Sequence, residues 1–346
     1  MRSRRDYNLP VLLWLLLLCS SAAGSIADTV EQTQPKIAKI YGAGGMRGME
    51  AYQTGILISP EGHILTVFSH VLDTDYITAV LADGRKFDAK LIGADPRLEI
   101  AVLKIEAAGL PYYDLAKAAK ADGGAGVLAF SNLFGVAIGN EPASVQRGTI
   151  SVVTRLDARR GVADTPYRGP IYVLDVTTNN PGAPGGALVT RGGELLGMLG
   201  KELRNSLNNT WLNYAIPIEE LRQSVDDIRG GKFVARREPE GAKKPPHALD
   251  LASLGIVLIP DVVERTPPYV DRVQPGSAAE KAGVRPDDLI LLLGDHLIQS
   301  CKVLASELEY VDAEDAIALT VLRGQELIAF SLRSGGEPQP AKKEQP

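Results

Sequence analysis

The sequence predicts a protein dominated by β-structure, with two small barrels followed by a further small domain. Two observations support this fold class. Short runs rich in β-branched residues recur between residues 37 and 217, separated by turns of Gly, Pro and Asp. Their spacing of about ten residues is typical of barrels and sandwiches. A charged, proline-bearing segment then separates this region from a second folded stretch, as expected of a linker.

The composition indicates a soluble globular protein of two or three domains. Its 346 residues are 45% hydrophobic and 23% charged, with a formal net charge of −5. There is no basic excess to suggest a nucleic-acid partner. If Cys19 is removed with a leader, Cys301 is the remaining cysteine, which excludes an intrachain disulfide and a cysteine-rich metal site. The four histidines lack metal-ligand spacing, so we expect neither a metal nor an organic cofactor.

The N-terminus has the order of a secretory signal peptide. Three arginines lie within residues 1–5, an apolar run covers residues 9–18 apart from Pro10, and small residues follow at 20–24. This run is about half of the ~20 residues that span a bilayer, so we expect removal and no stable membrane span. We predict a leader over residues 1–27, cleaved near Ala23 or Ala27, and a periplasmic or secreted protein.

The next region, residues 36–233, contains two sets of predicted strands. The first set is expected at 53–59, 63–68, 76–81, 86–92 and 99–105, and the second at 126–130, 148–153, 171–176, 187–190, 195–201 and 211–216. Two barrels of about 90 residues each fit this count. Apolar residues at helical spacing over 218–228 predict a helix that closes the domain, and its stop signal is the pair Gly230-Gly231.

The rest of the chain divides into three parts. Residues 234–250 carry charges and prolines without apolar periodicity and are expected to be a linker. Residues 251–334 form a second folded unit. Residues 335–346 are rich in Pro, Lys, Glu and Gln, a composition typical of a disordered tail.

The segment from Asn180 to Gly186 reads Asn-Pro-Gly-Ala-Pro-Gly-Gly. It resembles the nucleophile loop of the HtrA (Deg) family of trypsin-like serine proteases, Asn-Pro-Gly-Asn-Ser-Gly-Gly. The resemblance implies a trypsin-like double β-barrel in which Gly182 and Gly185 belong to the oxyanion loop. Glycines suit a loop that turns backbone N–H groups toward a developing negative charge. The position of the nucleophilic serine is occupied by Pro184.

Proline at this position removes two functions at once. It has no hydroxyl to attack a carbonyl and no backbone N–H to donate to the oxyanion. Losing one oxyanion donor costs roughly 10²–10³ in rate, and losing the nucleophile costs on the order of 10⁶ in a well-studied serine protease. The loop therefore indicates a loss of peptidase activity.

Two further segments extend the resemblance. Residues 62–72 are similar to the family segment that carries the catalytic base, which implies this role for His70. Residues 95–105 are similar to the segment whose second aspartate orients the base, and here that position is Glu99. The extra methylene should move the carboxylate by about an ångström. We therefore expect Glu99 to hold His70 less well than aspartate would.

The C-terminal unit resembles a PDZ domain. Residues 251–258 are similar to its carboxylate-binding loop and following strand, and residues 270–284 to its Val-x-Pro-x-Ser-Pro-Ala-x-x-Ala-Gly segment. The resemblance implies peptide binding by main-chain N–H groups and a free strand edge. The residues expected to contribute are Leu254, Gly255, Ile256 and Val257. A helix over 300–310 would form the other wall of the groove.

These observations favour an exported HtrA-like pseudoprotease that binds a polypeptide or a C-terminal peptide through its PDZ domain. One alternative is an active serine endopeptidase in protein quality control that uses a displaced hydroxyl, with Thr177, Thr178 and Thr190 nearby in sequence. Another is a non-catalytic subunit of an assembly with an active HtrA homologue. The family resemblance also implies a homo-oligomer, usually a trimer formed through an N-terminal segment, here residues 28–36.

Overall fold

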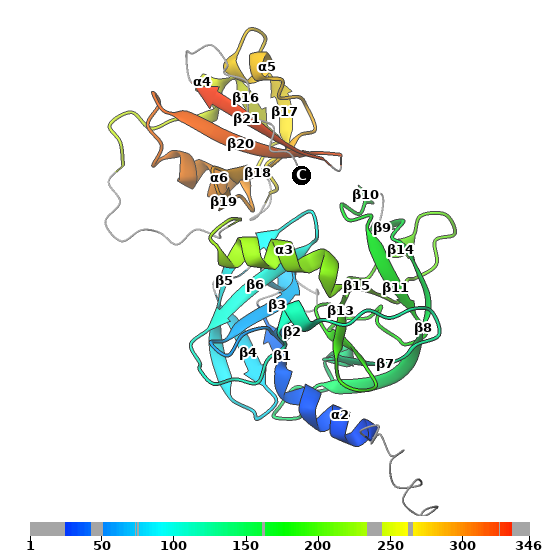
Figure 1. Ribbon diagram of the computed structural model, residues 1–346. Coiled ribbons are helices and arrows are strands. Elements are labelled where there is room, and N and C mark those ends of the chain that lie inside the picture. The colour runs from blue at the N-terminus through cyan, green and yellow to red at the C-terminus, as the bar shows by residue number, and fades with distance from the viewer. Residues whose placement is uncertain are drawn as a thin grey trace, which may run out of the picture.

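The structure is a computed structural model that describes residues 25–42, 51–72, 74, 76–160, 163–233, 244–261, 266–324 and 326–333. Two closed six-stranded barrels lie side by side, and a smaller domain follows them (Figure 1). The predicted β-dominated double barrel is confirmed. Most of the predicted leader, residues 234–243 of the predicted linker and the whole predicted tail lie outside the described residues.

The first barrel has the strand order β1-β2-β3-β6-β5-β4, and it closes because β1 pairs with both β2 and β4. Apolar side chains such as Ile40, Ile64 and Leu103 fill its interior and are fully buried. The strands are β1 (Ile37–Tyr41), β2 (Tyr52–Leu57), β3 (His63–Val67), β4 (Ile77–Leu81), β5 (Lys86–Asp95) and β6 (Ile100–Ile105). Short 3₁₀ turns η2 (His70–Leu72) and η3 (Leu115–Lys117) follow β3 and β6.

The second barrel has the order β11-β15-β13-β12-β7-β8. Strand β8 is twice as long as predicted, since its ends are solvent-exposed and carry little apolar signal. The strands are β7 (Gly126–Ser131), β8 (Ser144–Arg155), β11 (Pro170–Leu174), β12 (Ala187–Thr190), β13 (Leu195–Leu199) and β15 (Tyr214–Pro217), with the turn η4 (Leu133–Gly135) after β7.

A three-stranded sheet beside the second barrel is not predicted by the sequence. It has the order β10-β9-β14 and consists of β9 (Ala158–Arg160), β10 (Ala163–Asp164) and β14 (Arg204–Asn205). These strands are two or three residues long and rich in arginine, so they lack the alternating apolar pattern on which strand prediction depends.

Two helices frame the barrels. Helix α2 (Ile26–Thr33) begins at Ser25 with a capping box to Asp28, continues into the turn η1 (Gln34–Lys36), and docks through a hydrogen bond from Thr29 Oγ1 to the Arg191 carbonyl (2.7 Å). The predicted leader, residues 1–27, overlaps the first two residues of this helix, because the leader is predicted to end at the candidate cleavage site Ala27.

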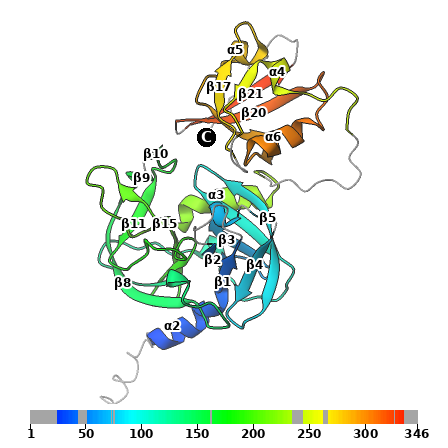
Figure 2. The ribbon, with the colours of Figure 1, turned by 180° about the vertical axis from the view of Figure 1, so that it is seen from behind.

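Helix α3 (Ile218–Arg229) matches the helix predicted at 218–228 and lies across the barrels on the side that faces the C-terminal domain (Figure 1 and Figure 2). Its apolar face is buried. The fully buried Asp95 of β5 accepts a hydrogen bond from Ser224 Oγ of α3 (2.7 Å) and pairs with Arg97 (2.8 Å). This contact fixes α3 against the first barrel.

The C-terminal domain contains a two-stranded sheet, β16-β17, and a four-stranded sheet in the order β19-β18-β20-β21. Its core includes Leu254, Ile290, Leu304 and Leu319. Its elements are α4 (Leu251–Leu254), β16 (Ile256–Leu258), β17 (Val270–Val273), α5 (Ala278–Ala282), β18 (Leu289–Leu293), β19 (His296–Leu297), α6 (Cys301–Leu308), β20 (Ala316–Arg323) and β21 (Glu326–Arg333).

We expect Asp288→Ala to weaken this domain by about 3–5 kcal/mol, because it breaks a buried ion pair. Asp288 has no exposed side-chain surface and accepts two hydrogen bonds from Arg323 (2.7 and 2.8 Å). Amide hydrogen exchange of β18 and β20 measures the loss. Asp83→Ala is the control, since the exposed Asp83–Arg85 pair is worth about 0–1 kcal/mol. An equal effect of both substitutions on these strands would contradict the prediction.

Candidate functional site

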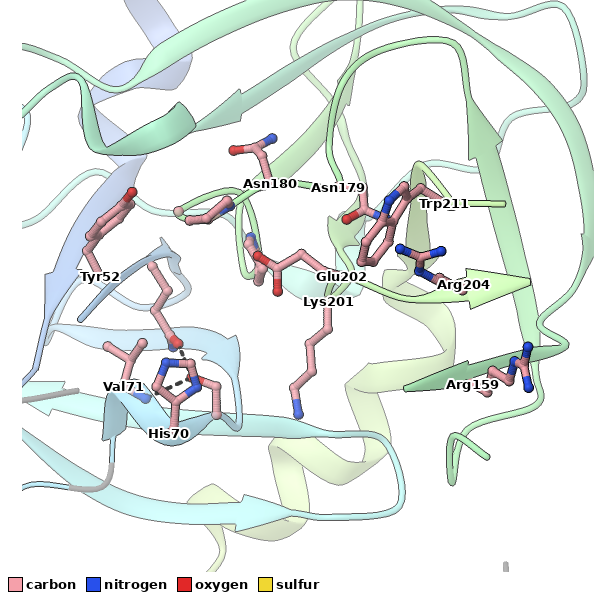
Figure 3. A pocket seen from close by; sticks show the side chains of 15 residues that line it. Tyr52, His70, Val71, Arg159, Asn179, Asn180, Lys201, Glu202, Arg204 and Trp211 are labelled. Atoms are coloured by element: carbon pink, nitrogen blue, oxygen red, sulfur yellow. Dashed lines mark hydrogen bonds between the residues drawn. The ribbon is translucent and has the colours of Figure 1, made fainter. Parts of the chain in front are cut away.

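Residues from both barrels line one cavity of about 530 Å³ (Figure 3). The first barrel contributes His70, which lies in the turn η2 directly after β3. The second barrel contributes Gly182 and Pro184 from the loop between β11 and β12. Three residues predicted from the sequence are therefore brought to one site. Gly185 and Glu99 do not line this cavity.

The glycines of the loop are required by its geometry. Gly182 and Gly185 have φ of +86° and +83°, which side chains other than glycine rarely adopt. A Cβ at Gly182 would stand 2.0 Å from the Asn132 carbonyl oxygen, and one at Gly185 would stand 2.1 Å from the Thr54 carbonyl oxygen. Close backbone approach therefore explains both positions.

The loop offers few amides to a ligand. The amide of Gly185 donates to Leu199 and that of Gly186 to Ala183, while Pro184 has no N–H and its carbonyl accepts from the Thr54 amide (3.0 Å). Within the described residues, the Gly182 amide has no acceptor. It is therefore the loop's one candidate oxyanion donor among residues 182–186.

Thr54, in the middle of β2, holds this loop from the opposite barrel. Its Oγ1 donates to the Gly182 carbonyl (2.6 Å) and accepts from the Asn132 amide (2.8 Å). Sequence reasoning missed Thr54, because a threonine inside a strand carries no signal that distinguishes it from a β-forming residue.

The Glu99 carboxylate is bound by Lys201 of the other barrel. The Glu99 backbone has φ of +53°, and the carboxylate accepts a 2.6 Å hydrogen bond from Lys201 Nζ. The Lys201 side chain is 8% exposed and that of Glu99 is 24% exposed, so this ion pair is largely buried and links the two barrels. Among the described residues, His70 is not a partner of the Glu99 carboxylate.

Lys201, which follows β13, also lines the cavity. The hydroxyl-bearing residues that line the cavity are Tyr52 and Ser69, and Thr177, Thr178 and Thr190 are not among them. The Ser69 hydroxyl donates to Gln53 Oε1 (2.5 Å) and accepts from the Val71 amide (3.1 Å), so it is held in the loop.

A second candidate site lies in the C-terminal domain. Strand β16 pairs with β17, and within the described residues no strand pairs with its other edge. Leu254 and Ile256 are buried and Val257 is half-buried. Gly255 has φ of +81°, and its amide donates to the Ala252 carbonyl (3.0 Å) as the cap of α4. The Gly255 amide is therefore bonded within the end of α4 and is not one of the main-chain N–H groups left for a peptide.

Comparisons with known proteins agree with this geometry. The family model for a trypsin-like peptidase domain matches residues 53–198, and the PDZ domain model matches residues 249–322. A probable periplasmic serine protease do/HhoA-like of Haemophilus influenzae is 31% identical over 83% of this chain and 59% of its own length. The chain belongs to the HtrA/Deg family. A probable periplasmic serine endoprotease DegP-like of Ectopseudomonas mendocina is 30% identical over 89% of this chain and 64% of its own length.

A solved HtrA-type protease with a tripeptide shares the fold, with a TM-score of 0.50 at 23% identity, covering 91% of this chain and 99% of that one. The chain spans about half to two thirds of the length of its curated HtrA-type relatives, between 50% and 67%. These relatives include several named periplasmic. Among the helices of the described residues, none has the length and hydropathy of a bilayer-crossing segment.

Proposed function

We propose that this chain is an exported HtrA-type protein that binds polypeptides through its PDZ domain and does not cleave them. One observation carries the proposal: Pro184 occupies the nucleophile position of the loop and lines the same cavity as His70. The cavity thus retains a candidate base but lacks a hydroxyl at the matched position.

The surrounding chemistry supports the loss of activity. Acyl transfer needs a nucleophile, an oriented base and donors for the oxyanion. Pro184 supplies neither hydroxyl nor amide, and the Glu99 carboxylate is bound to Lys201. The Gly182 amide by itself would leave the site at least 10²–10³ below a complete oxyanion hole.

The PDZ domain supplies the binding function. A peptide can add as a strand to the unpaired edge of β16, where backbone hydrogen bonds give affinity and pockets give specificity. Half-buried Val257 and Leu258 lie on this strand, with buried Ile256 at its start. The HtrA-type protease of similar fold was solved with a tripeptide, which is compatible with this proposal. Because the Gly255 amide caps α4, we place the main recognition on the strand edge and not on that amide.

Export is proposed from the leader predicted over residues 1–27 and from relatives named periplasmic. N-terminal sequencing of protein recovered from the periplasm or the medium tests this directly. A start at or before residue 28 with residues 1–20 missing is expected. An intact Met1 in the cytosolic fraction would contradict export.

We expect the purified protein to show no labelling by a fluorophosphonate probe and no cleavage of unfolded casein. Ser69→Ala is the matched control, because Ser69 is the serine that lines the cavity. Equal, background-level signals in both proteins are expected. Labelling of the unmodified protein that disappears in Ser69→Ala would overturn the proposal and favour an endopeptidase with a displaced nucleophile. Binding of a fluorescent peptide with a free C-terminus, measured by anisotropy, tests the PDZ function separately.

A further inference from the structure

The sheet β10-β9-β14 brings two arginines together at the cavity. In its register Arg159 of β9 lies directly opposite Arg204 of β14, so both side chains are on one face. Both residues line the cavity that also contains His70 and Pro184. Figure 3 shows them with Trp211 on the side of the cavity away from His70.

The partners of both guanidinium groups are uncharged. Arg159 Nη2 donates to the Asn209 side chain (3.3 Å), Arg204 Nη1 donates to the Asn209 carbonyl (3.4 Å), and the Arg204 guanidinium lies 4.0 Å from the centre of the Trp211 ring. The Nε of Arg159 is buried without a hydrogen-bond acceptor in the described part of the chain. No carboxylate described there pairs with either arginine. Apart from these bonds to Asn209, the Nη groups of both arginines have no acceptor among the described residues, so they can donate to an anion.

The other described charges that line the cavity, Lys201 and Glu202, do not pair with the two arginines. Lys201 is neutralised by Glu99 at 2.6 Å. Glu202 also lines the cavity. In Figure 3 its carboxylate points away from Arg204. In the register of the sheet, Asp164 of β10 lies directly opposite Arg159 across the other edge of β9, on the same face as the two arginines. Like charges directly opposite each other in a sheet are destabilising, and an anion between them would relieve that repulsion.

We propose that this cleft binds an acidic polypeptide segment, with a Glu or Asp carboxylate held between Arg159 and Arg204. Arginine's fork of donors matches a carboxylate in two parallel hydrogen bonds. Trp211 is 55% exposed and offers a flat apolar surface for the adjoining chain. This ligand is separate from the one proposed for the PDZ domain, and the inference stands whether or not the PDZ domain binds.

A polypeptide fits better than a nucleic acid. The cavity continues to the nucleophile loop, where the Gly182 amide has no acceptor among the described residues and can bond a peptide carbonyl. Glu202 in the cavity would repel a row of phosphates, and the chain as a whole carries a net charge of −5. An isolated carboxylate on a peptide needs only the two arginines.

The fluorescence of Trp211 can report binding in this cavity. The sequence has two tryptophans, Trp14 in the predicted leader and Trp211 in the cavity. In a Trp14→Phe background, tryptophan fluorescence reports on Trp211 alone. The probe is an acetylated and amidated decapeptide with a single Glu among Ala and Ser residues, so that it carries one carboxylate and has no terminal carboxylate for the PDZ domain. We expect a saturable change in fluorescence that weakens with salt, and no change with the Gln-for-Glu peptide.

Arg159→Gln and Arg204→Gln should each weaken binding roughly tenfold or more, because each removes charge-assisted hydrogen bonds. Arg222→Gln is the charge-matched control, since Arg222 is exposed on α3 away from the cavity. Unchanged affinity in the Arg159→Gln/Arg204→Gln double variant would overturn the proposal. So would tighter binding of a ten-nucleotide oligothymidylate, or binding by the unmodified protein that is independent of salt. These last two results need no variant and hold even if the double variant fails to fold. Free-carboxylate peptide binding measured by anisotropy reports separately on the PDZ domain.

Discussion

Pro184→Ser combined with Glu99→Asp is expected to react with a fluorophosphonate on the order of 10² times faster than Pro184→Ser alone. Serine at position 184 restores both the hydroxyl and the second oxyanion amide. In the single variant the Glu99 carboxylate stays bound to Lys201, so this carboxylate is not available to orient His70. Loss of the orienting aspartate costs about 10⁴ in other serine proteases.

Aspartate also suits the backbone at this position. Residue 99 has φ of +53°, a conformation in which Asp is enriched and longer side chains are uncommon. The shorter side chain reaches less far toward Lys201. Labelling rates and casein cleavage measure the gain, and His70→Ala in the double variant should abolish it. Equal rates for the single and double variants would show that Glu99 already orients the base.

Lys201→Met is expected to lower the free energy of unfolding by roughly 3–5 kcal/mol, because it removes one partner of a largely buried ion pair. Lys201 and Glu99 are joined at 2.6 Å across the two barrels. Without the ammonium group, the Glu99 carboxylate stays in a poorly solvated position. Urea unfolding of the full chain measures the loss, with the slope compared between variants to check that the same surface is exposed.

The double variant Lys201→Met/Glu99→Gln distinguishes the contribution of the ion pair to stability from that of side-chain packing. Replacing both charges removes the unpaired carboxylate, so most of the lost stability should return. Lys120→Met is the surface control, since the Lys120–Glu219 pair is well exposed and its loss should leave the urea midpoint almost unchanged. A Lys201→Met midpoint equal to that of the control would contradict a structural role for the ion pair.

Strand prediction is correct where alternating or continuous apolar residues face a barrel interior. The segment at 187–190 is predicted to the residue, and the helix at 218–228 differs by one residue from α3. The ends of β8 and the short strands β9, β10 and β14 escape prediction, since they are exposed or arginine-rich. Hydrophobic periodicity reports burial, and these strands are held by backbone pairing with little burial.

Some properties of the candidate site can likewise be predicted from the sequence, and others depend on the tertiary structure. The sequence by itself determined the family, the loop, and the chemical loss at Pro184, because a residue's functional groups do not depend on the fold. Only the tertiary structure decided that Glu99 turns to Lys201, 102 residues away, and that Arg159 and Arg204 share one face of a sheet at the cavity. Whether two charged side chains pair depends on their distance and on how deeply they are buried. For segments that are distant in the chain, both depend on how the barrels close.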